Sequence, residues 1–183
     1  MVKDNKTVII MVSGKAESGK NTCARLFAEN CQLSGVRMLS FAEPVKEFAR
    51  LLGWNGVKDE YGRAMLQWLG DGVKQFNSIL WATKAAQKII ELKKLGYRCF
   101  IFSDCRYLDE ISFFKDRYSK VFVIRVNRPR HKSSLTEEQL KHPSECALDD
   151  YDFDAVITND GNMSNLEDHC YNAIGKIKIL GDF

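Results

Sequence analysis

A short glycine-bounded pattern near the start of the chain constrains its fold more than any other feature. Residues 14–20 read Gly-Lys-Ala-Glu-Ser-Gly-Lys and match GxxxxGK. The pattern follows a continuous β-branched run at 7–12, which predicts a strand buried on both faces, and it opens a segment with helical spacing. Glycines let such a loop curl with its N–H groups pointing inward, and the helix N-terminus adds partial positive charge. The sequence therefore predicts a phosphate-binding loop between a strand and a helix.

Apolar runs alternate with helical patterns along the rest of the chain, which favours a parallel sheet with helices on both faces. The expected strands are 7–12, 36–41, 99–103, 121–126 and 155–158. The expected helices are 19–33, 44–52, 79–95, 108–118 and a last helix, opened by a capping box of Ser164 and Glu167, that continues to about 177. Residues 53–78 carry five glycines among aromatics and predict short helices and loops. A second capping box, Thr136 with Gln139, lies in the polar stretch 127–150.

Size and charge exclude several classes of protein. The 183 residues suit one domain, 1–183, better than two. The net charge of +3, from 27 basic and 24 acidic side chains, gives no support to a general nucleic-acid binder. No run approaches the roughly 20 apolar residues of a membrane span, and the N-terminus is unlike a secretory signal. We therefore expect a cytoplasmic protein with no membrane or nucleic-acid partner.

The six cysteines contain no CxxC pair, so a zinc site is not expected. Buried, reduced thiols are the expectation instead.

The phosphate loop predicts ATP and Mg²⁺ as cofactors. Lys20 is expected to reach the β- and γ-phosphates. The residue after it, which should carry a hydroxyl for magnesium, is Asn21. Either Thr22 takes over this role, or magnesium is held mainly by water, phosphates and Asp104. The predicted nucleotide-binding residues are Gly14, Lys15, Ser18, Gly19, Lys20, Asn21 and Thr22, with Arg128 and Arg130.

Five blocks of sequence, in this order, resemble the phage-type deoxynucleoside monophosphate kinases, within the P-loop nucleoside monophosphate kinase group. Each later block alone is weak, but their joint order and spacing are specific. The blocks are Ser13–Thr22 (family SGxxxSGKDT, with Asn21 for Asp), Phe41–Lys46 (FADPLK), Leu66–Asp71 (LQxLGTD), Ser103–Tyr107 with Glu110 (SDVRFxxE), and His142–Glu145 followed by Phe153-Asp154 and Asn159–Gly161 (HxSE…FDxxIxNDG).

The resemblance implies a P-loop kinase fold of class α/β: a five-stranded parallel sheet with helices on both faces and a small lid segment. The acceptor-binding segment is expected at about 42–78 and the lid at about 127–150. The implied activity is transfer of the ATP γ-phosphoryl group to a nucleoside or deoxynucleoside monophosphate. The partners expected are small nucleotides, and the protein is expected to be a monomer or a homodimer.

Transfer between two phosphates requires converging cations more than a general base. Asp104 ends a hydrophobic strand, where ligands bind in open α/β sheets, and is expected to hold magnesium directly or through water. Arg106 is expected to form a bidentate contact with the acceptor phosphate. Arg128 and Arg130 are expected at the start of a lid segment, which would close over the triphosphate. The predicted catalytic residues are Lys20, Asp104, Arg106 and Arg128, and the predicted metal ligands are Thr22 and Asp104.

The predicted acceptor-binding residues are Lys46, Arg63, Gln67, Trp68 and Arg106. Trp68, Trp81 and Phe76 are candidates to stack on a base, although aromatics at helical spacing more often pack in a core. His142 with Glu145 is a candidate anchor for the far end of the lid. Asn159–Gly161 either lies near the adenine or is a plain turn.

Three alternatives remain. In the first, the acceptor is dephospho-coenzyme A or phosphomevalonate, whose kinases carry related motifs. In the second, the chain is a nucleotide-binding regulator with little turnover, an interpretation that Asn21 favours. A GTPase is disfavoured because Asn159-Asp160 does not match the guanine motif NKxD.

Overall fold

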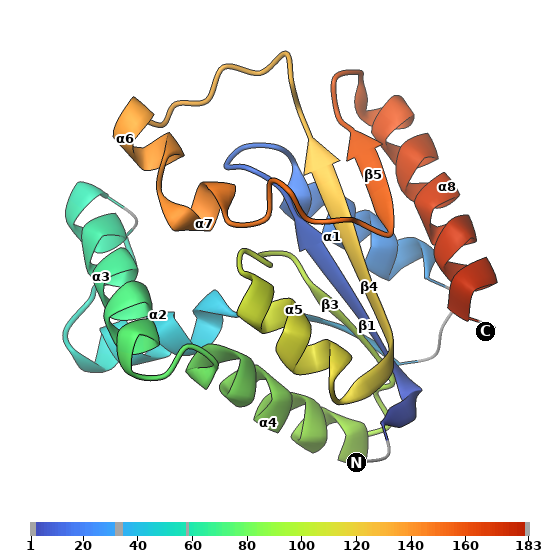
Figure 1. Ribbon diagram of the computed structural model, residues 1–183, viewed down its shortest axis with the longest axis horizontal. Coiled ribbons are helices and arrows are strands. Elements are labelled where there is room, and N and C mark those ends of the chain that lie inside the picture. The colour runs from blue at the N-terminus through green and yellow to red at the C-terminus, as the bar shows by residue number, and fades with distance from the viewer. Residues whose placement is uncertain (1–2, 32–34, 58, 182–183) are drawn as a thin grey trace.

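The computed structural model describes residues 3–31, 35–57 and 59–181, and the side chains among them up to residue 177. Five strands form one sheet in the order β2-β3-β1-β4-β5 (Figure 1), and every neighbouring pair is parallel. The strands are β1 (Asp4–Ser13), β2 (Val36–Leu39), β3 (Cys99–Phe102), β4 (Tyr118–Asn127) and β5 (Ala155–Thr158). The predicted five-stranded parallel sheet is therefore confirmed.

Helices cover both faces of the sheet, as expected (Figure 1). One face carries α1 (Lys20–Asn30) and α8 (Met163–Gly181), and the other carries α4 (Leu80–Lys94) and α5 (Leu108–Lys115). Beyond one end of the sheet lie α2 (Ala42–Leu51) and α3 (Glu60–Phe76). Two short helices, α6 (Glu137–Leu140) and α7 (Pro143–Cys146), lie in the segment that joins β4 to β5.

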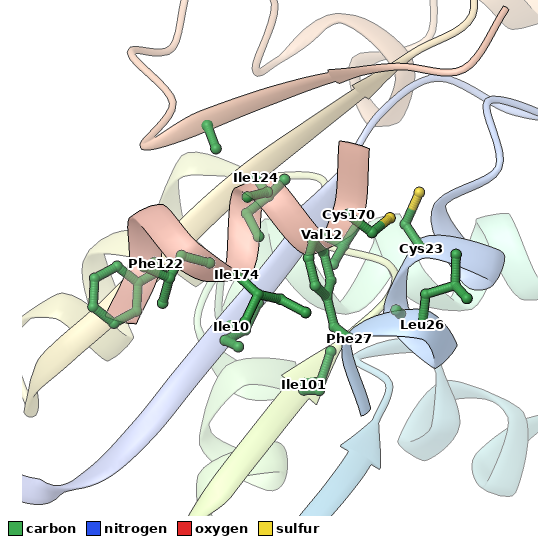
Figure 2. Close-up of a cluster of buried hydrophobic side chains, with 14 of the residues drawn as sticks. Ile10, Val12, Cys23, Leu26, Phe27, Ile101, Phe122, Ile124, Cys170 and Ile174 are labelled. Carbon is green, nitrogen blue, oxygen red and sulfur yellow. The ribbon is translucent and has the colours of Figure 1, made fainter. Parts of the chain in front are cut away.

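The central strand β1 explains why the sheet needs cover on both faces. Its side chains alternate between the two faces because successive residues of a strand point in opposite directions. Ile10 and Val12 pack with Phe27 of α1 (Figure 2), whereas Ile9 and Met11 pack on the side of α4 and α5. Each buried aliphatic side chain contributes roughly 1.5–3 kcal/mol of transfer free energy.

A third apolar cluster joins α2 and α3 to α4, with Val45, Leu69 and Trp81 among its buried members. The prediction of short helices and loops for 53–78 is wrong, because α3 is one continuous helix of 17 residues. Its N-cap is Asp59, whose carboxylate accepts the Gly62 N–H at 2.7 Å. Interior glycines cost a helix about 1 kcal/mol each, and the packing of its apolar face against α2 and α4 offsets that cost.

Two predicted boundaries at the carboxyl ends of elements are wrong by two or three residues. The strand expected over 36–41 ends at Leu39, because Ser40 and Phe41 turn to bind Asp104. The helix expected over 108–118 ends at Lys115, and Tyr118 begins β4. The expected end of the first helix, Leu33, lies outside the described residues.

The caps of the later helices give a mixed result. The capping box of Thr136 and Gln139 is confirmed at the start of α6. The box predicted for Ser164 and Glu167 is wrong, because α8 already begins at Met163. The reciprocal pair is Asn162 with Asn165, whose side-chain oxygens each accept the other residue's backbone N–H, at 3.0 and 3.2 Å.

Five of the six cysteines are buried free thiols, as expected, but Cys146 on α7 is exposed. Within the described part of the chain, no helix combines the length and apolar character needed to cross a membrane.

Candidate active site

A cavity of about 770 Å³ lies where the carboxyl ends of β1 and β3 face α2, α3 and the segment that joins β4 to β5. Ligands of open α/β sheets bind at such ends. The lining brings together seven of the predicted site residues: Lys20, Asn21, Lys46, Arg63, Gln67, Asp104 and Arg106. Thr22, Trp68, Arg128 and Arg130 do not line it.

Both ends of the phosphate loop require glycine. Gly14 approaches β4 so closely that a Cβ atom there would lie 2.4 Å from the Val126 carbonyl oxygen. Gly19 has φ +98°, in the left-handed region that other residues rarely adopt. The two glycines of GxxxxGK are therefore explained by backbone geometry.

Lys20 is buried, and its ammonium donates to the Lys15 carbonyl oxygen at 2.5 Å. Burial lowers the pKa of Lys20 from 10.5 to about 7, and repulsion from Arg106 and Arg125 adds to this effect. Glu145 and Asp104 act in the opposite direction. An arriving phosphate would relieve this unfavourable burial of positive charge.

The other loop residues differ in what they contact. Ser18 Oγ is buried, and no hydrogen-bond partner for it exists among the described residues. A buried hydroxyl without a partner inside a phosphate loop is an observation that fits a phosphate ligand. Lys15 instead pairs with Asp149 at 3.1 Å, on a half-exposed surface.

Asp104 ties β3 to the start of α2. Its carboxylate accepts the Ser40 hydroxyl at 2.6 Å and the N–H groups of Phe41 and Ala42, both at 3.0 Å. A carboxylate at a helix N-terminus is stabilised by the unpaired N–H groups and by the helix dipole. Asp104 therefore fixes the orientation of α2 relative to the sheet, a role that the sequence did not indicate.

The residues around Asp104 fit a magnesium ion held mainly by phosphates and water. Two of these hydrogen bonds reach Oδ2 and one reaches Oδ1, so a carboxylate with about four acceptor positions retains one on Oδ1. The described residues contain no cluster of three or more acidic, histidine or cysteine side chains that could enclose a metal. Magnesium seldom needs such a cage when substrate phosphates supply ligands. Asn21 lines the same cavity, and the metal role predicted for Thr22 gains no support.

Arg106 is held by two acidic residues that the predicted site omitted. Its guanidinium pairs with Glu145 and donates to the Ser144 carbonyl oxygen at 2.8 Å. Its backbone N–H donates to the Glu110 carboxylate at 2.8 Å, and so does that of Tyr107, at 3.1 Å. Burial raises the pKa of Glu110 to about 7, although these hydrogen bonds and Lys74 oppose the rise. Both acids belong to sequence blocks quoted for the family resemblance, which was the available signal.

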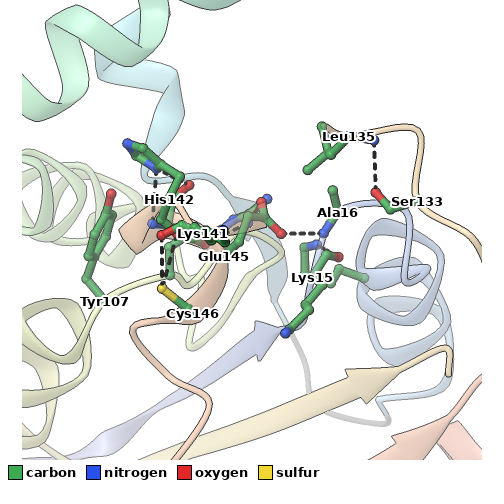
Figure 3. A network of polar contacts seen from close by, with 12 residues as sticks. Lys15, Ala16, Tyr107, Ser133, Leu135, Lys141, His142, Glu145 and Cys146 are labelled. Atoms are coloured by element: carbon green, nitrogen blue, oxygen red, sulfur yellow. Dashed lines mark hydrogen bonds and ion pairs between the residues drawn. The ribbon is translucent and has the colours of Figure 1, made fainter. Parts of the chain in front are cut away.

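The expected lid segment, 127–150, contacts the phosphate loop along much of its length. Glu17 binds Ser134 through the backbone N–H, at 3.1 Å, and through the hydroxyl, and it lies 2.8 Å from His131 Nε2. These contacts lower the pKa of Glu17 to about 2. Farther along, the Glu145 carboxylate accepts the Ala16 N–H at 2.7 Å (Figure 3).

The two predicted lid arginines make different contacts. Arg128 is exposed and donates to the Glu17 carbonyl oxygen at 3.4 Å. Arg130 is exposed and lies 3.8 Å from the Asp160 carboxylate. Neither guanidinium lines the cavity in this arrangement.

On the acceptor side, the predicted residues differ in how they lie relative to the cavity. Trp68 is 71% exposed and lies outside the cavity lining, as does Phe76. Trp81 does line the cavity, and its indole N–H donates to the Gly70 carbonyl oxygen at 3.2 Å. Lys46 lines it while pairing with Glu43 at 3.0 Å.

A polar group that sequence reasoning missed connects α3 to the lid segment. Asp71 lies 3.0 Å from His142 Nε2 and accepts the Tyr107 hydroxyl at 3.3 Å. The Lys74 ammonium lies 2.9 Å from the centre of the Tyr107 ring. The group gives His142 the anchoring contact expected of the far end of the lid.

Comparison with known proteins supports the resemblance found in the sequence. A family model described as phosphomevalonate kinase matches residues 12–120. The deoxynucleotide monophosphate kinase of Enterobacteria phage T4 is 32% identical over 115 residues, which are 61% of this chain and 45% of the phage protein. The matched region thus spans less than half the length of that relative. These matches confirm the resemblance to kinases of the nucleoside monophosphate type.

Two solved structures are similar over nearly their whole length. An APS kinase of Mycobacterium tuberculosis is 9% identical, with 93% of this chain and 98% of that chain covered and a TM-score of 0.49. A shikimate kinase of Bacteroides thetaiotaomicron is 14% identical, with 96% and 99% covered and a TM-score of 0.42.

Proposed function

This chain belongs to the phosphomevalonate kinase family, and from that premise we propose that it is an ATP-dependent kinase whose acceptor already carries a phosphate. The acceptor that we propose first is a nucleoside or deoxynucleoside monophosphate. The observation that supports this proposal is the composition of one cavity. Lys20 and the phosphate loop form one side, Lys46 and Arg63 of α2 and α3 form the other, and Arg106 lies in the same lining.

The proposed reaction joins an oxygen of the acceptor phosphate to the γ-phosphorus of ATP while the bond from that phosphorus to ADP breaks. The attacking oxygen is already anionic, so no strong base is needed. The loop N–H groups, Ser18 Oγ and Lys20 would bind the triphosphate, and Arg106 would bring the acceptor phosphate into line. Asp104 and Asn21 would hold a magnesium ion, whose positive charge would offset the negative charge of the transferred group when it is bound.

The acceptor side suits a nucleotide. Lys46, Arg63 and Gln67 offer donors to a phosphate and to a sugar or base, and Trp81 adds an aromatic surface. The similarity to the phage deoxynucleotide monophosphate kinase favours the same choice. Segment 42–78 would then be the acceptor-binding part and 127–150 the lid of a single kinase domain, 1–183.

Phosphomevalonate is the second candidate acceptor, because the family model that matches 12–120 carries that description. It has a phosphate but no base, so it would use Arg63 and Lys46 without needing an aromatic surface. A regulator with little turnover is the third candidate, because Asn21 replaces the usual hydroxyl residue.

A coupled ADP-release assay with Mg-ATP separates these candidates. The panel contains all ribo- and deoxyribonucleoside monophosphates, dephospho-coenzyme A and phosphomevalonate, with Lys20→Ala as the inactive control. We expect turnover with one or a few nucleoside monophosphates. Turnover with phosphomevalonate alone would select the second candidate, and ATP binding without ADP formation for any acceptor would select the third.

We also propose that the protein works in the cytoplasm on small nucleotides, as a monomer or a homodimer. Light scattering after gel filtration measures its oligomeric state.

A further inference from the structure

Glu145 is a buried carboxylate that lies against the phosphate loop. Only 8% of the residue is exposed. Its Oε2 accepts the Ala16 N–H at 2.7 Å, and its Oε1 pairs with the Arg106 guanidinium. Figure 3 shows this side chain reaching from α7 towards the loop.

The groups around Glu145 are those that bind phosphate in proteins. Inward-pointing N–H groups of a glycine-bounded loop bind anions, and a guanidinium forks onto carboxylate or phosphate equally well. The Lys20 ammonium also interacts favourably with the Glu145 charge. The carboxylate thus satisfies donors that a phosphate oxygen would otherwise use.

We propose that Glu145 is an internal anion that occupies a phosphate subsite of the empty protein and is displaced by the polyphosphate chain of the donor nucleotide. This inference rests on the proposed function in that it takes the donor to be a nucleoside triphosphate. The subsite is formed by the Ala16 N–H, with Lys20 close by, and Arg106 is the cation that the displaced carboxylate releases.

Displacement of Glu145 has a consequence for the acceptor side. Arg106 is bound to Glu145 and to the Ser144 carbonyl oxygen, which both belong to α7. When phosphate takes the place of the carboxylate, α7 loses its contact with Ala16 and Arg106 becomes available to the acceptor phosphate. Glu145 therefore acts as a positioning residue that couples filling of the donor site to release of Arg106.

A different role for the same contacts would be that of a strut, in which Glu145 shapes the loop and strengthens donor binding. The two roles predict opposite effects when the charge is removed. An internal anion competes with phosphate, so its neutral replacement should bind phosphate more tightly. A strut supports the loop, so its replacement should bind phosphate more weakly.

The test compares wild type with Glu145→Gln by isothermal titration with inorganic tripolyphosphate and with Mg-ATP, in the absence of any acceptor. The glutamine keeps the shape and still accepts the Ala16 N–H, but it carries no charge. We expect about fivefold tighter binding of both probes, in the ordinary range of coupling between sites. Glu138→Gln, on the exposed surface of α6, is the matched control and should bind as wild type does. Equal or weaker binding by folded Glu145→Gln, or no binding of tripolyphosphate by either protein, would overturn the proposal.

Hydrogen exchange on the wild-type protein gives a second test that does not depend on how the variant folds. Tripolyphosphate should slow exchange in the loop, 14–20, and speed it in α7, because α7 loses its contact with the loop. Slower hydrogen exchange in both the loop and α7 would show that Glu145 acts as a strut, and would overturn the proposal. Neither experiment measures turnover. If the protein formed no ADP with any acceptor, the proposed function would be refuted, but the titration and the hydrogen exchange would still decide the role of Glu145.

Discussion

The side-chain amide of Asn159 donates a hydrogen bond of 2.9 Å to the carbonyl oxygen of Ser18. This contact joins the residue that follows β5 to the phosphate loop, across 141 positions of sequence. The same amide nitrogen lies 2.4 Å from where a Cβ atom of residue 19 would be. Asn159 therefore packs directly on the phosphate loop. The motif Asn159–Gly161 thus does more than form a turn after β5, because its first residue supports the loop.

Gly19→Ala should weaken ATP binding by at least about tenfold, because the new methyl group meets Asn159 and the backbone has φ +98°. The double variant Gly19→Ala, Asn159→Gly removes the clash but keeps the backbone strain, so it should recover only part of the affinity. Gly175→Ala in α8 is the control, since its Cβ would meet nothing within 4 Å. Titration with ATP measures all three, and full recovery in the double variant would contradict the strain argument.

Lys20→Ala should lower turnover by at least about a hundredfold, because the ammonium is the buried positive charge nearest the transferred phosphate in the proposed mechanism. Lys88→Ala is the matched control, because Lys88 is an exposed helix residue paired with Glu91 at 3.0 Å. Steady-state ADP release at saturating acceptor measures the effect. Turnover unchanged in Lys20→Ala would refute the phosphate-loop assignment.

ATP binding should take up protons above neutral pH. The pKa of Lys20 is about 7 in the empty protein, so its amine is mostly neutral at about pH 8.5. Bound phosphates favour the ammonium and raise that pKa, so binding draws in a proton, and affinity falls as the pH rises from 7 to about 9. Titrations in buffers of different ionisation enthalpy measure the uptake. Lys20→Met should abolish it, and equal uptake in that variant would assign the proton to another group.

The same pKa has an effect on stability with a defined sign. The unfolded chain holds Lys20 at its ordinary pKa of 10.5, so between pH 7 and 10.5 the unfolded state binds more protons than the folded state. The free energy of unfolding of the empty protein therefore gains a contribution from Lys20 that grows as the pH rises through this window. Lys20→Met should lack this contribution in denaturant titrations at several pH values.

The sheet and the phosphate loop were predictable because each depends on local pattern. A continuous β-branched run predicts a strand covered on both faces, and β1 is such a strand. The spacing of Gly14 and Gly19 follows from backbone conformations that only glycine tolerates. Such features need no knowledge of the tertiary fold.

The helix α3 and the acidic partners of Arg106 were not predictable in the same way. Interior glycines argue against a helix in isolation, and only packing against α2 and α4 compensates for them. Glu145 reaches Ala16 across 129 positions of sequence, so its role depends on where the lid segment folds. Trp68 illustrates the same limit, because its place in a family block predicted an acceptor contact but does not reveal that the side chain is 71% exposed.

Arg106→Ala should raise the KM of the acceptor by about tenfold and change the KM of ATP much less, because a guanidinium fork contributes most to the phosphate that it binds. Arg37→Ala is the control on β2, away from the cavity, where the guanidinium lies 5.9 Å from the centre of the Tyr97 ring. Steady-state kinetics with each substrate varied in turn separates the two constants. If only the KM of ATP rises, Arg106 belongs to the donor site.

Asp71→Ala should loosen the contact between α3 and the lid segment. Asp71 lies 3.0 Å from His142 Nε2, and His142 Nδ1 already accepts the Ser144 N–H at 3.2 Å, so Nε2 carries the proton that Asp71 accepts. Loss of this hydrogen bond costs about 1 kcal/mol, so local opening of the lid should become roughly fivefold more frequent. Hydrogen exchange over residues 137–146 measures that opening, with Asp168→Ala, at an exposed position of α8, as the control. Unchanged exchange in Asp71→Ala would show that the other contacts of the lid segment, among them those with Glu17 and Ala16, hold it without Asp71.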